Sequence, residues 1–236
     1  MHTIFTKVFI GGMPRSGSTF TFNVVRELLA ASGPVVYEAA VNFNPKLLKS
    51  DAHYINKAHH LEQDSLDLVR AGGLKCVMTI RNPRDAVASW MHTFGFSLRQ
   101  SITVQKQWFE LFRNLHDVCL TLPFGMIEHS PHTAIREIAA YLEVDASDAE
   151  FSRIQQALDK NLLREKYAAL DKDQANVVVT RFSHFDATTF FHRRHVNAWK
   201  SNAAQDVLSL EEIAHIDREL GECVGLCRSH NPDWNG

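Results

Sequence analysis

The feature that most constrains this 236-residue chain is a glycine-rich turn between an apolar run and a helix-like segment. The run at residues 7–10 leads into Gly12-Met13-Pro14-Arg15-Ser16-Gly17-Ser18-Thr19, and residues 18–31 repeat apolar side chains at helical spacing. A strand, a glycine turn and a helix in this order form the context of a phosphate-binding loop, where backbone N–H groups face an anion. Ser18 stands where the nucleotide-triphosphate motif has lysine, and the nearest cation is Arg15.

A second cation follows the strongest strand pattern in the chain. Residues 74–80 (LKCVMTI) form a largely apolar run, which is typical of a strand buried on both faces, and the run ends at Arg81. The carboxyl ends of strands in such sheets face the ligand crevice. A magnesium-dependent nucleotide enzyme needs an acidic metal ligand as well as the loop lysine. A guanidinium at this strand end favours a second phosphate site and predicts no metal.

The alternation of strand-like and helix-like segments predicts an α/β fold with a mainly parallel sheet and helices on both faces, in three layers. Strands are expected at residues 7–10, 34–38, 54–59, 74–80 and 124–128. Helices are expected at residues 18–31, 64–71, 83–93, 101–120, 133–142 and 210–227. We expect a single domain over residues 1–236, with a phosphate-binding core at about 7–142 and a helical, lid-like part at about 146–236.

Composition limits the classes of partner and the location. The formal net charge of −2 gives no general attraction to nucleic acid, so we expect no nucleic-acid partner and a strictly local anion site. The chain has no stretch of about 18 uncharged apolar residues and no signal-peptide pattern at its start, so we expect a cytoplasmic protein without a membrane span. The four cysteines and 13 histidines lack metal-ligand spacing.

The two cationic turns together resemble those of sulfotransferases that use 3′-phosphoadenylyl sulfate (PAPS). Pro14-Arg15-Ser16-Gly17-Ser18-Thr19-Phe20 is similar to the family's 5′-phosphosulfate loop, in which a Lys or Arg at the place of Arg15 lies on the phosphosulfate bridge. Arg81, with Ser89 eight residues later, is similar to the 3′-phosphate-binding stretch. The resemblance implies a P-loop NTPase-like fold and a donor site formed by Arg15, Ser16, Gly17, Ser18, Thr19, Phe20, Arg81 and Ser89.

Two further segments add to the resemblance. Lys57-Ala58-His59 is similar to the Lys-x-His of the cytosolic branch, in which the histidine is the general base and the lysine touches the sulfuryl group. His60 remains the alternative base at this point. Residues 193–200 are similar to the segment that closes over the 3′-phosphate, which implies that Arg193 or Arg194 completes that site. Ile127-Glu128 occupies the stretch where cytosolic members often carry Tyr-Glu, so the aromatic partner for adenine is missing there.

The chemistry of sulfuryl transfer suits these residue types. A sulfuryl group carries one negative charge where a γ-phosphate carries about two, so arginine and backbone N–H groups can replace a metal. Charge that grows on the leaving oxygen is stabilised by Arg15, and a histidine takes the proton of the acceptor. We therefore expect transfer of a sulfuryl group from PAPS to a hydroxyl or amine, with release of adenosine 3′,5′-bisphosphate (PAP).

The sequence leaves the acceptor and two other functions open. The acceptor could be a small molecule, a lipid or a carbohydrate, and residues 37–54, 93–103 and 146–192 are expected to build its pocket. A P-loop small-molecule or nucleotide kinase with a degenerate loop is one alternative, and it predicts dependence on ATP and magnesium. A non-catalytic member that only binds the nucleotide is the other. The oligomeric state is not predicted.

Overall fold

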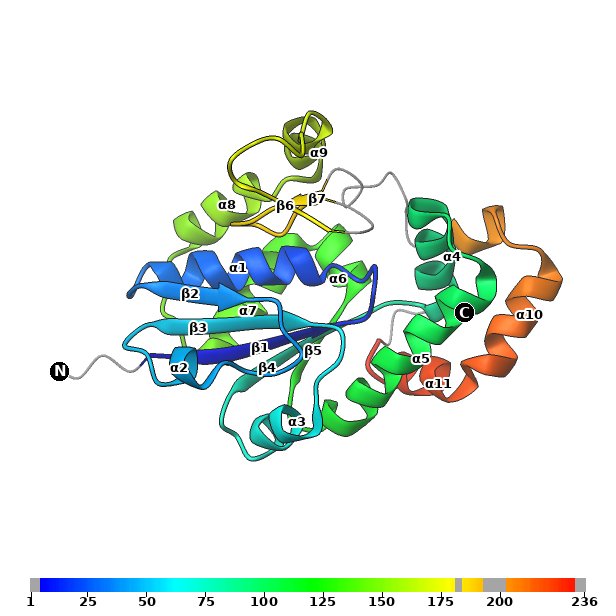
Figure 1. The fold of residues 1–236 in the computed structure, drawn as a ribbon, viewed down its shortest axis with the longest axis horizontal. Coiled ribbons are helices and arrows are strands. Elements are labelled where there is room, and N and C mark those ends of the chain that lie inside the picture. Colours follow the sequence, from blue (N-terminus) through cyan, green and yellow to red (C-terminus); the bar gives the residue numbers. More distant parts are fainter. Residues whose placement is uncertain (1–4, 181–183, 193–202, 232–236) are drawn as a thin grey trace.

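The computed structural model describes residues 5–180, 184–192 and 203–231 (Figure 1). Five parallel strands form the central sheet in the order β2-β3-β1-β4-β5, with β1 in the middle. In register, Gly11 of β1 lies opposite Ala58 of β3 and Met78 of β4. The strands are β1 (Lys7–Gly12), β2 (Val35–Glu38), β3 (His53–Ala58), β4 (Lys75–Ile80) and β5 (Leu120–Pro123).

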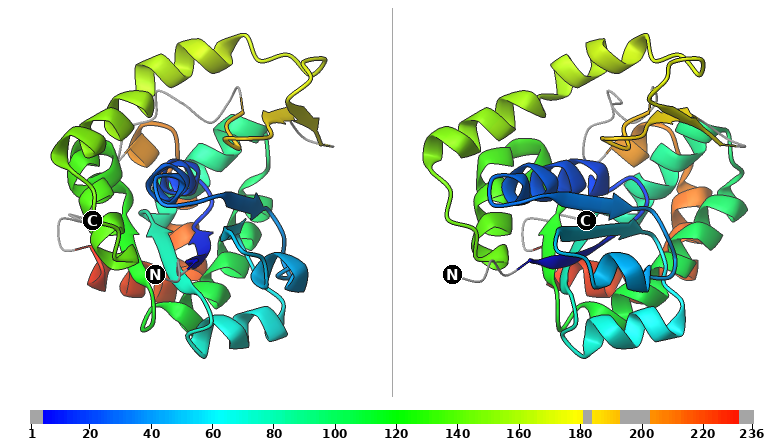
Figure 2. Two further views of the ribbon diagram at one scale, coloured as in Figure 1. Left: turned by 90° about the vertical axis from the view of Figure 1, so that its left-hand side faces the viewer. Right: turned by 60° about the vertical axis from the view of Figure 1, so that its left-hand side comes forward.

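The sheet is covered on both faces because alternate strand residues point to opposite sides. Val8 and Ile10 of β1 belong to an apolar cluster with α1 (Ser18–Ala30), α7 (Pro131–Leu142) and α8 (Asp148–Ala157). Phe9, between them, belongs to the opposite cluster. The helices of that second cluster are α3 (Gln63–Arg70), α4 (Pro83–Phe94), α5 (Leu98–Leu115), α10 (Leu210–Glu219) and α11 (Gly221–Ser229). The three-layer arrangement in Figure 2 confirms the predicted fold class.

The remaining elements lie around this core. On the α1 side, Figures 1 and 2 show α8, α9 (Lys160–Ala168) and an antiparallel hairpin of β6 (Val177–Val179) and β7 (His184–Asp186). The short helices are α2 (Pro45–Leu48), α6 (Phe124–His129) and the 3-10 turn η1 (Ala203–Asp206). Within the described residues, none of the helices combines the length and apolar character that crossing a membrane requires.

Three of the predicted elements are wrong in part. The strand expected at 124–128 is instead helix α6, because β5 ends at Pro123 after pairing Leu120 with Val77 of β4. The helix expected at 101–120 runs from Leu98 to Leu115, since Ser97 caps it with Gln100 and the residues that follow lead into β5. The helix expected at 210–227 is two helices, α10 and α11, separated where Leu220 leaves the helical conformation.

Candidate active site

The carboxyl ends of β1 and β4 open into a cavity of about 360 Å³. Residues 12–20 and 81–89, which follow these two strands, form what we call the cationic side of the cavity. Its far wall is formed by residues of α6, α8 and α9 together with Phe191 and His192. Eight of the predicted site residues line the cavity: Arg15, Gly17, Ser18, Thr19, Phe20, His59, Arg81 and Ser89.

The turn after β1 has a tightly specified backbone. Arg15 and Gly17 both have positive φ, at 71° and 92°, and such a conformation is uncommon for a side chain like that of arginine. Ser16 fastens the turn to β4: its Oγ lies 2.6 Å from the carbonyl oxygen of Met13 and 2.6 Å from Oγ1 of Thr79. The Ser16 amide also donates to Met13. Ser16, predicted to bind the donor, therefore shapes the turn and does not line the cavity.

The N-terminus of α1 opens directly into the cavity. Gly17 is the N-cap and has no side chain to accept from the first-turn amides, which find no partner inside a helix. Ser18 and Thr19 in this first turn line the cavity and are almost fully buried. Backbone N–H groups and the positive end of the helix dipole thus converge on one spot, which is a favourable site for an anion.

The two predicted arginines meet in this cavity. Arg81 donates from Nη1 to the carbonyl oxygen of Arg15 at 3.2 Å, and Arg15 donates from Nε to Oγ of Ser89 at 3.1 Å. Ser89, which the resemblance groups with Arg81, therefore contacts Arg15. Burial, and then the charge of Arg81, lower the pKa of Arg15 to about 10. Two buried guanidiniums this close repel each other, and an anion of more than one charge between them would relieve that cost.

Besides its hydrogen bond to Arg15, Arg81 contacts Phe124 and Asp85. Its side chain is 4% exposed, its guanidinium lies 4.3 Å from the ring centroid of Phe124, and its Nε is 4.0 Å from Oδ2 of Asp85. Asp85 in turn accepts from the backbone N–H of Ala204 at 2.9 Å, so the start of α4 is bonded to η1. Among the described residues, no cluster of three or more His, Cys, Asp or Glu side chains could hold a metal ion.

His59 follows β3 and has the tautomer that a general base requires. Its Nδ1 lies 2.6 Å from the carbonyl oxygen of Gly12, which can only accept, so Nδ1 carries the proton and Nε2 is left with a lone pair. Burial and then the charge of Lys57 lower the pKa of His59 to about 4, so the ring is neutral at pH 7. Burial lowers the pKa of Lys57 to about 8. His60 is exposed and does not line the cavity, and neither does Lys57.

The far wall contains residues that sequence reasoning missed. Phe124 supplies an aromatic ring three residues before the Ile127-Glu128 stretch where that ring had been sought, and the wrong strand assignment at 124–128 concealed it. The side chain of Glu128 is 10% exposed and pairs with Lys160 of α9 at 3.3 Å. The only available signal was that an aromatic residue begins the strand candidate at 124–128.

The segments expected to build an acceptor pocket are only partly present in the cavity. Phe94 comes from residues 93–103, and Leu163 and Phe191 are among those that come from residues 146–192. None of the described lining residues comes from residues 37–54. Arg193 and Arg194 lie outside the described residues.

Comparison with known proteins places this geometry in context. No protein-family model matches the sequence, and no curated protein sequence matches it. Among solved structures, the mouse sulfotransferase SULT7A1 complexed with PAP aligns with a TM-score of 0.71 at 14% identity, over 96% of this chain and 89% of that one. Retinol dehydratase, in complex with androsterone and inactive cofactor PAP, aligns with a TM-score of 0.55 at 14% identity, over 93% and 81%. The chain therefore has the fold of the sulfotransferases, in agreement with the resemblance carried by its two cationic turns.

Proposed function

We propose that this protein is a PAPS-dependent sulfotransferase that transfers a sulfuryl group to a hydroxyl or amine. The observation that carries the proposal is the meeting of two turns that are 66 residues apart, since Nη1 of Arg81 reaches the backbone of Arg15. Each turn was identified separately as an anion site, and the donor has a phosphosulfate at one end and a phosphate at the other. Structural neighbours of 14% identity were solved with PAP.

The residues of the cavity fit such a donor. Arg15 and the first-turn amides of α1 are assigned to the 5′-phosphosulfate, and Arg81 with Ser89 to the 3′-phosphate. Arg193 or Arg194 is proposed to complete the 3′-phosphate site. Phe20 and Phe124 both line the cavity and offer aromatic faces for adenine. When bound, the donor supplies the sulfuryl group and a phosphate leaving group.

His59 is the proposed general base. Its Nε2 lone pair accepts the proton of the acceptor hydroxyl while the new S–O bond forms and the bond from sulfur to the bridging phosphate oxygen breaks. Arg15 and the N-terminus of α1 stabilise the negative charge that grows on that leaving oxygen. The contact between Nδ1 and Gly12 holds the imidazole in the reactive tautomer.

The low pKa of His59 depends on burial and then in part on the positive charges around it. With Lys57 as the second-largest cause of the low pKa, a polyanion bound on the cationic side would raise the pKa of His59 toward neutrality. The base would therefore become stronger when the donor is present. We assign Lys57 this electrostatic role and propose that it also contacts the sulfuryl group, as the resemblance to the family's Lys-x-His segment implies.

The acceptor is proposed to be a small molecule, a lipid or a carbohydrate. Trp90, Phe94 and Phe191 line the cavity, so apolar surface is available to an acceptor. The retinol dehydratase structures were solved with androsterone or with retinol, which are ligands of that protein.

Titration with PAP tests the donor site. PAP should raise the thermal midpoint of the protein, because a ligand that binds only the native state stabilises it, and EDTA should leave that shift unchanged. ATP with magnesium serves as the comparison for a kinase. A midpoint that responds to ATP and magnesium but not to PAP would refute the proposal. Turnover of labelled PAPS with a panel of phenols, alcohols, amines and sugars then separates an enzyme from a protein that only binds the nucleotide.

A further inference from the structure

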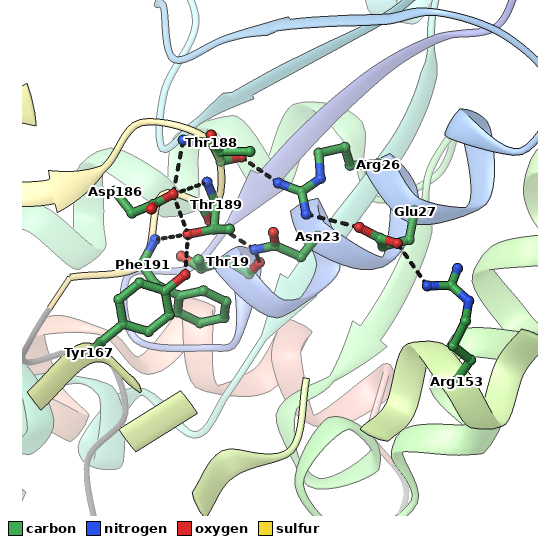
Figure 3. Close-up of polar contacts among 10 residues, drawn as sticks. All are labelled: Thr19, Asn23, Arg26, Glu27, Arg153, Tyr167, Asp186, Thr188, Thr189 and Phe191. Carbon is green, nitrogen blue, oxygen red and sulfur yellow. Dashed lines mark hydrogen bonds and ion pairs between the residues drawn. The ribbon is translucent and has the colours of Figure 1, made fainter. Parts of the chain in front are cut away.

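The turn that carries Phe191 into the far wall is fastened to α1, the same helix whose N-terminus faces the proposed donor (Figure 3). Asp186 organises the turn internally: its Oδ1 accepts from the backbone N–H of Thr188 at 3.0 Å and from that of Thr189 at 2.8 Å. The Asp186 amide also donates to the carbonyl oxygen of Phe191. Residues 186–191 are thus joined to one another by hydrogen bonds at both ends of the turn.

Asn23 attaches this turn to α1. Its side chain is fully buried, and Nδ2 donates to two carbonyl oxygens at 2.8 Å each, that of Thr19 in its own helix and that of Thr189 in the turn. One turn further along α1, Arg26 donates to the carbonyl oxygen of Thr188 at 2.6 Å from a more exposed position. The buried amide of Asn23 therefore joins the first turn of α1 directly to the turn at 186–191.

A second attachment comes from α9. The hydroxyl of Thr189 donates to Asp186, so it accepts from the hydroxyl of Tyr167, whose oxygen lies 2.8 Å away. The ring of Tyr167 also lies 5.4 Å from that of Phe191, centroid to centroid. Thr189 is thus the point at which α1, α9 and the turn are bonded together, as Figure 3 shows.

The turn reaches the cationic side through its last residues. His192 lies 5.8 Å from Phe94, centroid to centroid, and the guanidinium of Arg15 lies 5.8 Å from the centroid of the same ring. All three side chains line the cavity. The position of the turn therefore affects the width of the cavity beside Arg15, the residue that is assigned to the phosphosulfate of the donor.

We propose that Asn23 is a positioning residue that fixes the wall at Phe191 and His192 and thereby determines acceptor affinity much more than donor affinity. This inference rests on the proposed function. Donor affinity changes little because the carbonyl oxygen of Thr19 keeps its helical bond from the backbone N–H of Asn23 when the side chain is removed, so the first turn of α1 keeps its geometry. Acceptor affinity is not spared, because Thr189 then loses its bond to α1 and the wall is free to shift.

The test compares Asn23→Ala with Asn56→Ala. Asn56 is a matched control because it is also fully buried and also makes two hydrogen bonds, but both go to Ala40 in a loop that does not line the cavity. Hydrogen exchange of the PAP-saturated proteins should be about tenfold faster at residues 186–191 in Asn23→Ala and unchanged there in Asn56→Ala. Tyr167→Phe, which keeps the ring, should give a smaller change in the same direction.

Turnover separates positioning from general destabilisation. With PAPS and 2-naphthol as the acceptor probe, Asn23→Ala should raise the acceptor KM about tenfold while kcat changes less than about threefold, and the Kd of PAP should stay within about twofold of wild type. Two results would overturn the inference. One is equal hydrogen exchange at residues 186–191 in Asn23→Ala and Asn56→Ala, and the other is a rise in the Kd of PAP in Asn23→Ala that is as large as the rise in the acceptor KM. Failure of wild type to bind PAP would refute the proposed function instead, so the two failures are distinguishable.

Discussion

The cationic side and the far wall of the cavity are built in opposite ways. The cationic side consists of two short strand-turn-helix stretches, residues 12–20 and 81–89, whose geometry is set by local backbone requirements such as the positive φ of Gly17. The far wall collects side chains from α6, α8, α9 and residues 191–192, which only tertiary packing brings together. The comparison indicates that the proposed donor site is encoded in short motifs, whereas the far wall depends on how several later elements pack together.

This difference predicts different responses to substitution. On the cationic side, atoms pack so closely around the turn that a small change has a large effect. On the far wall, charged side chains such as Glu128 and Lys160 meet at the surface of the protein, where ion pairs are weak, so changes should be graded. The predictions below test this contrast in order of decreasing effect.

Gly12→Ala should have the largest effect. A Cβ at this position would lie 2.2 Å from Cβ of Ser18 and 2.6 Å from Oγ1 of Thr79, so either α1 or β4 must move. We expect loss of PAP binding together with a large drop in the thermal midpoint. Gly125→Ala in α6 is the control on the far wall, because a Cβ there meets nothing within 4 Å and should leave both quantities unchanged. Normal PAP binding by Gly12→Ala would contradict the described packing of the turn.

His59→Asn should lower kcat by about 10²- to 10⁴-fold, the range typical of general acid–base catalysis, with little change in the Kd of PAP. Asparagine can keep a donor toward the carbonyl oxygen of Gly12 but has no basic nitrogen. His60→Asn is the matched control, since His60 is adjacent and exposed. Steady-state kinetics with PAPS and an accepted acceptor provide the measurement. If His60→Asn loses activity and His59→Asn keeps it, the base is assigned to the wrong histidine.

Arg81→Gln should weaken PAP binding by about 10- to 100-fold, the loss of one or two charge-assisted hydrogen bonds. Arg84→Gln is the control from the same turn, because Arg84 pairs with Asp217 of α10 at 2.7 Å and does not line the cavity. Calorimetric titration of both variants distinguishes a specific anion contact from a general change in charge. Equal losses in the two variants would argue that Arg81 acts only through the net charge of the turn.

The same contrast explains what the sequence could and could not predict. Arg15, Arg81 and Ser89 were found because each lies at a fixed distance from a glycine or a strand end, and local geometry then determines their placement. The contact between Ser89 and Arg15 was not predicted, because it depends on how α1 and α4 lie relative to each other.

On the far wall, sequence patterns gave much weaker guidance. Phe124 was assigned to a strand over residues 124–128, because periodicity does not mark where β5 ends and α6 begins. The bonds that hold residues 186–191 link Asn23 to Thr189 across 166 residues, and no local pattern could indicate such a contact. The sheet order was not predicted for the same reason, although its parallel character was.

The stability of the protein should rise with pH between about 4 and 6.5 through His59. Its pKa is lowered to about 4 in the folded protein, so the unfolded chain binds more protons within this window, and the native state loses stability as the pH falls through it. The difference in unfolding free energy between wild type and His59→Asn should therefore change by on the order of 1 to 3 kcal/mol across the window. Denaturant titrations at pH 4.5 and 7 measure it, and the comparison cancels other groups such as His53. A difference that does not depend on pH would contradict the burial of His59.

Glu128→Gln on the far wall should have the smallest effect, and its sign is opposite to that of the arginine substitutions. The carboxylate of Glu128 pairs with Lys160. Burial lowers the pKa of Arg81, and the charges of Asp85 and then Glu128 partly offset that effect, so Glu128 competes with a bound anion for the same cations. Its removal should tighten PAP binding by about two- to fivefold at low salt, the magnitude of a weak ion pair, and the gain should shrink as salt is added. Glu137→Gln on α7 makes the same change in charge at an exposed position outside the cavity and should leave the Kd of PAP unchanged. Weaker binding by Glu128→Gln would show instead that this carboxylate contacts the nucleotide directly.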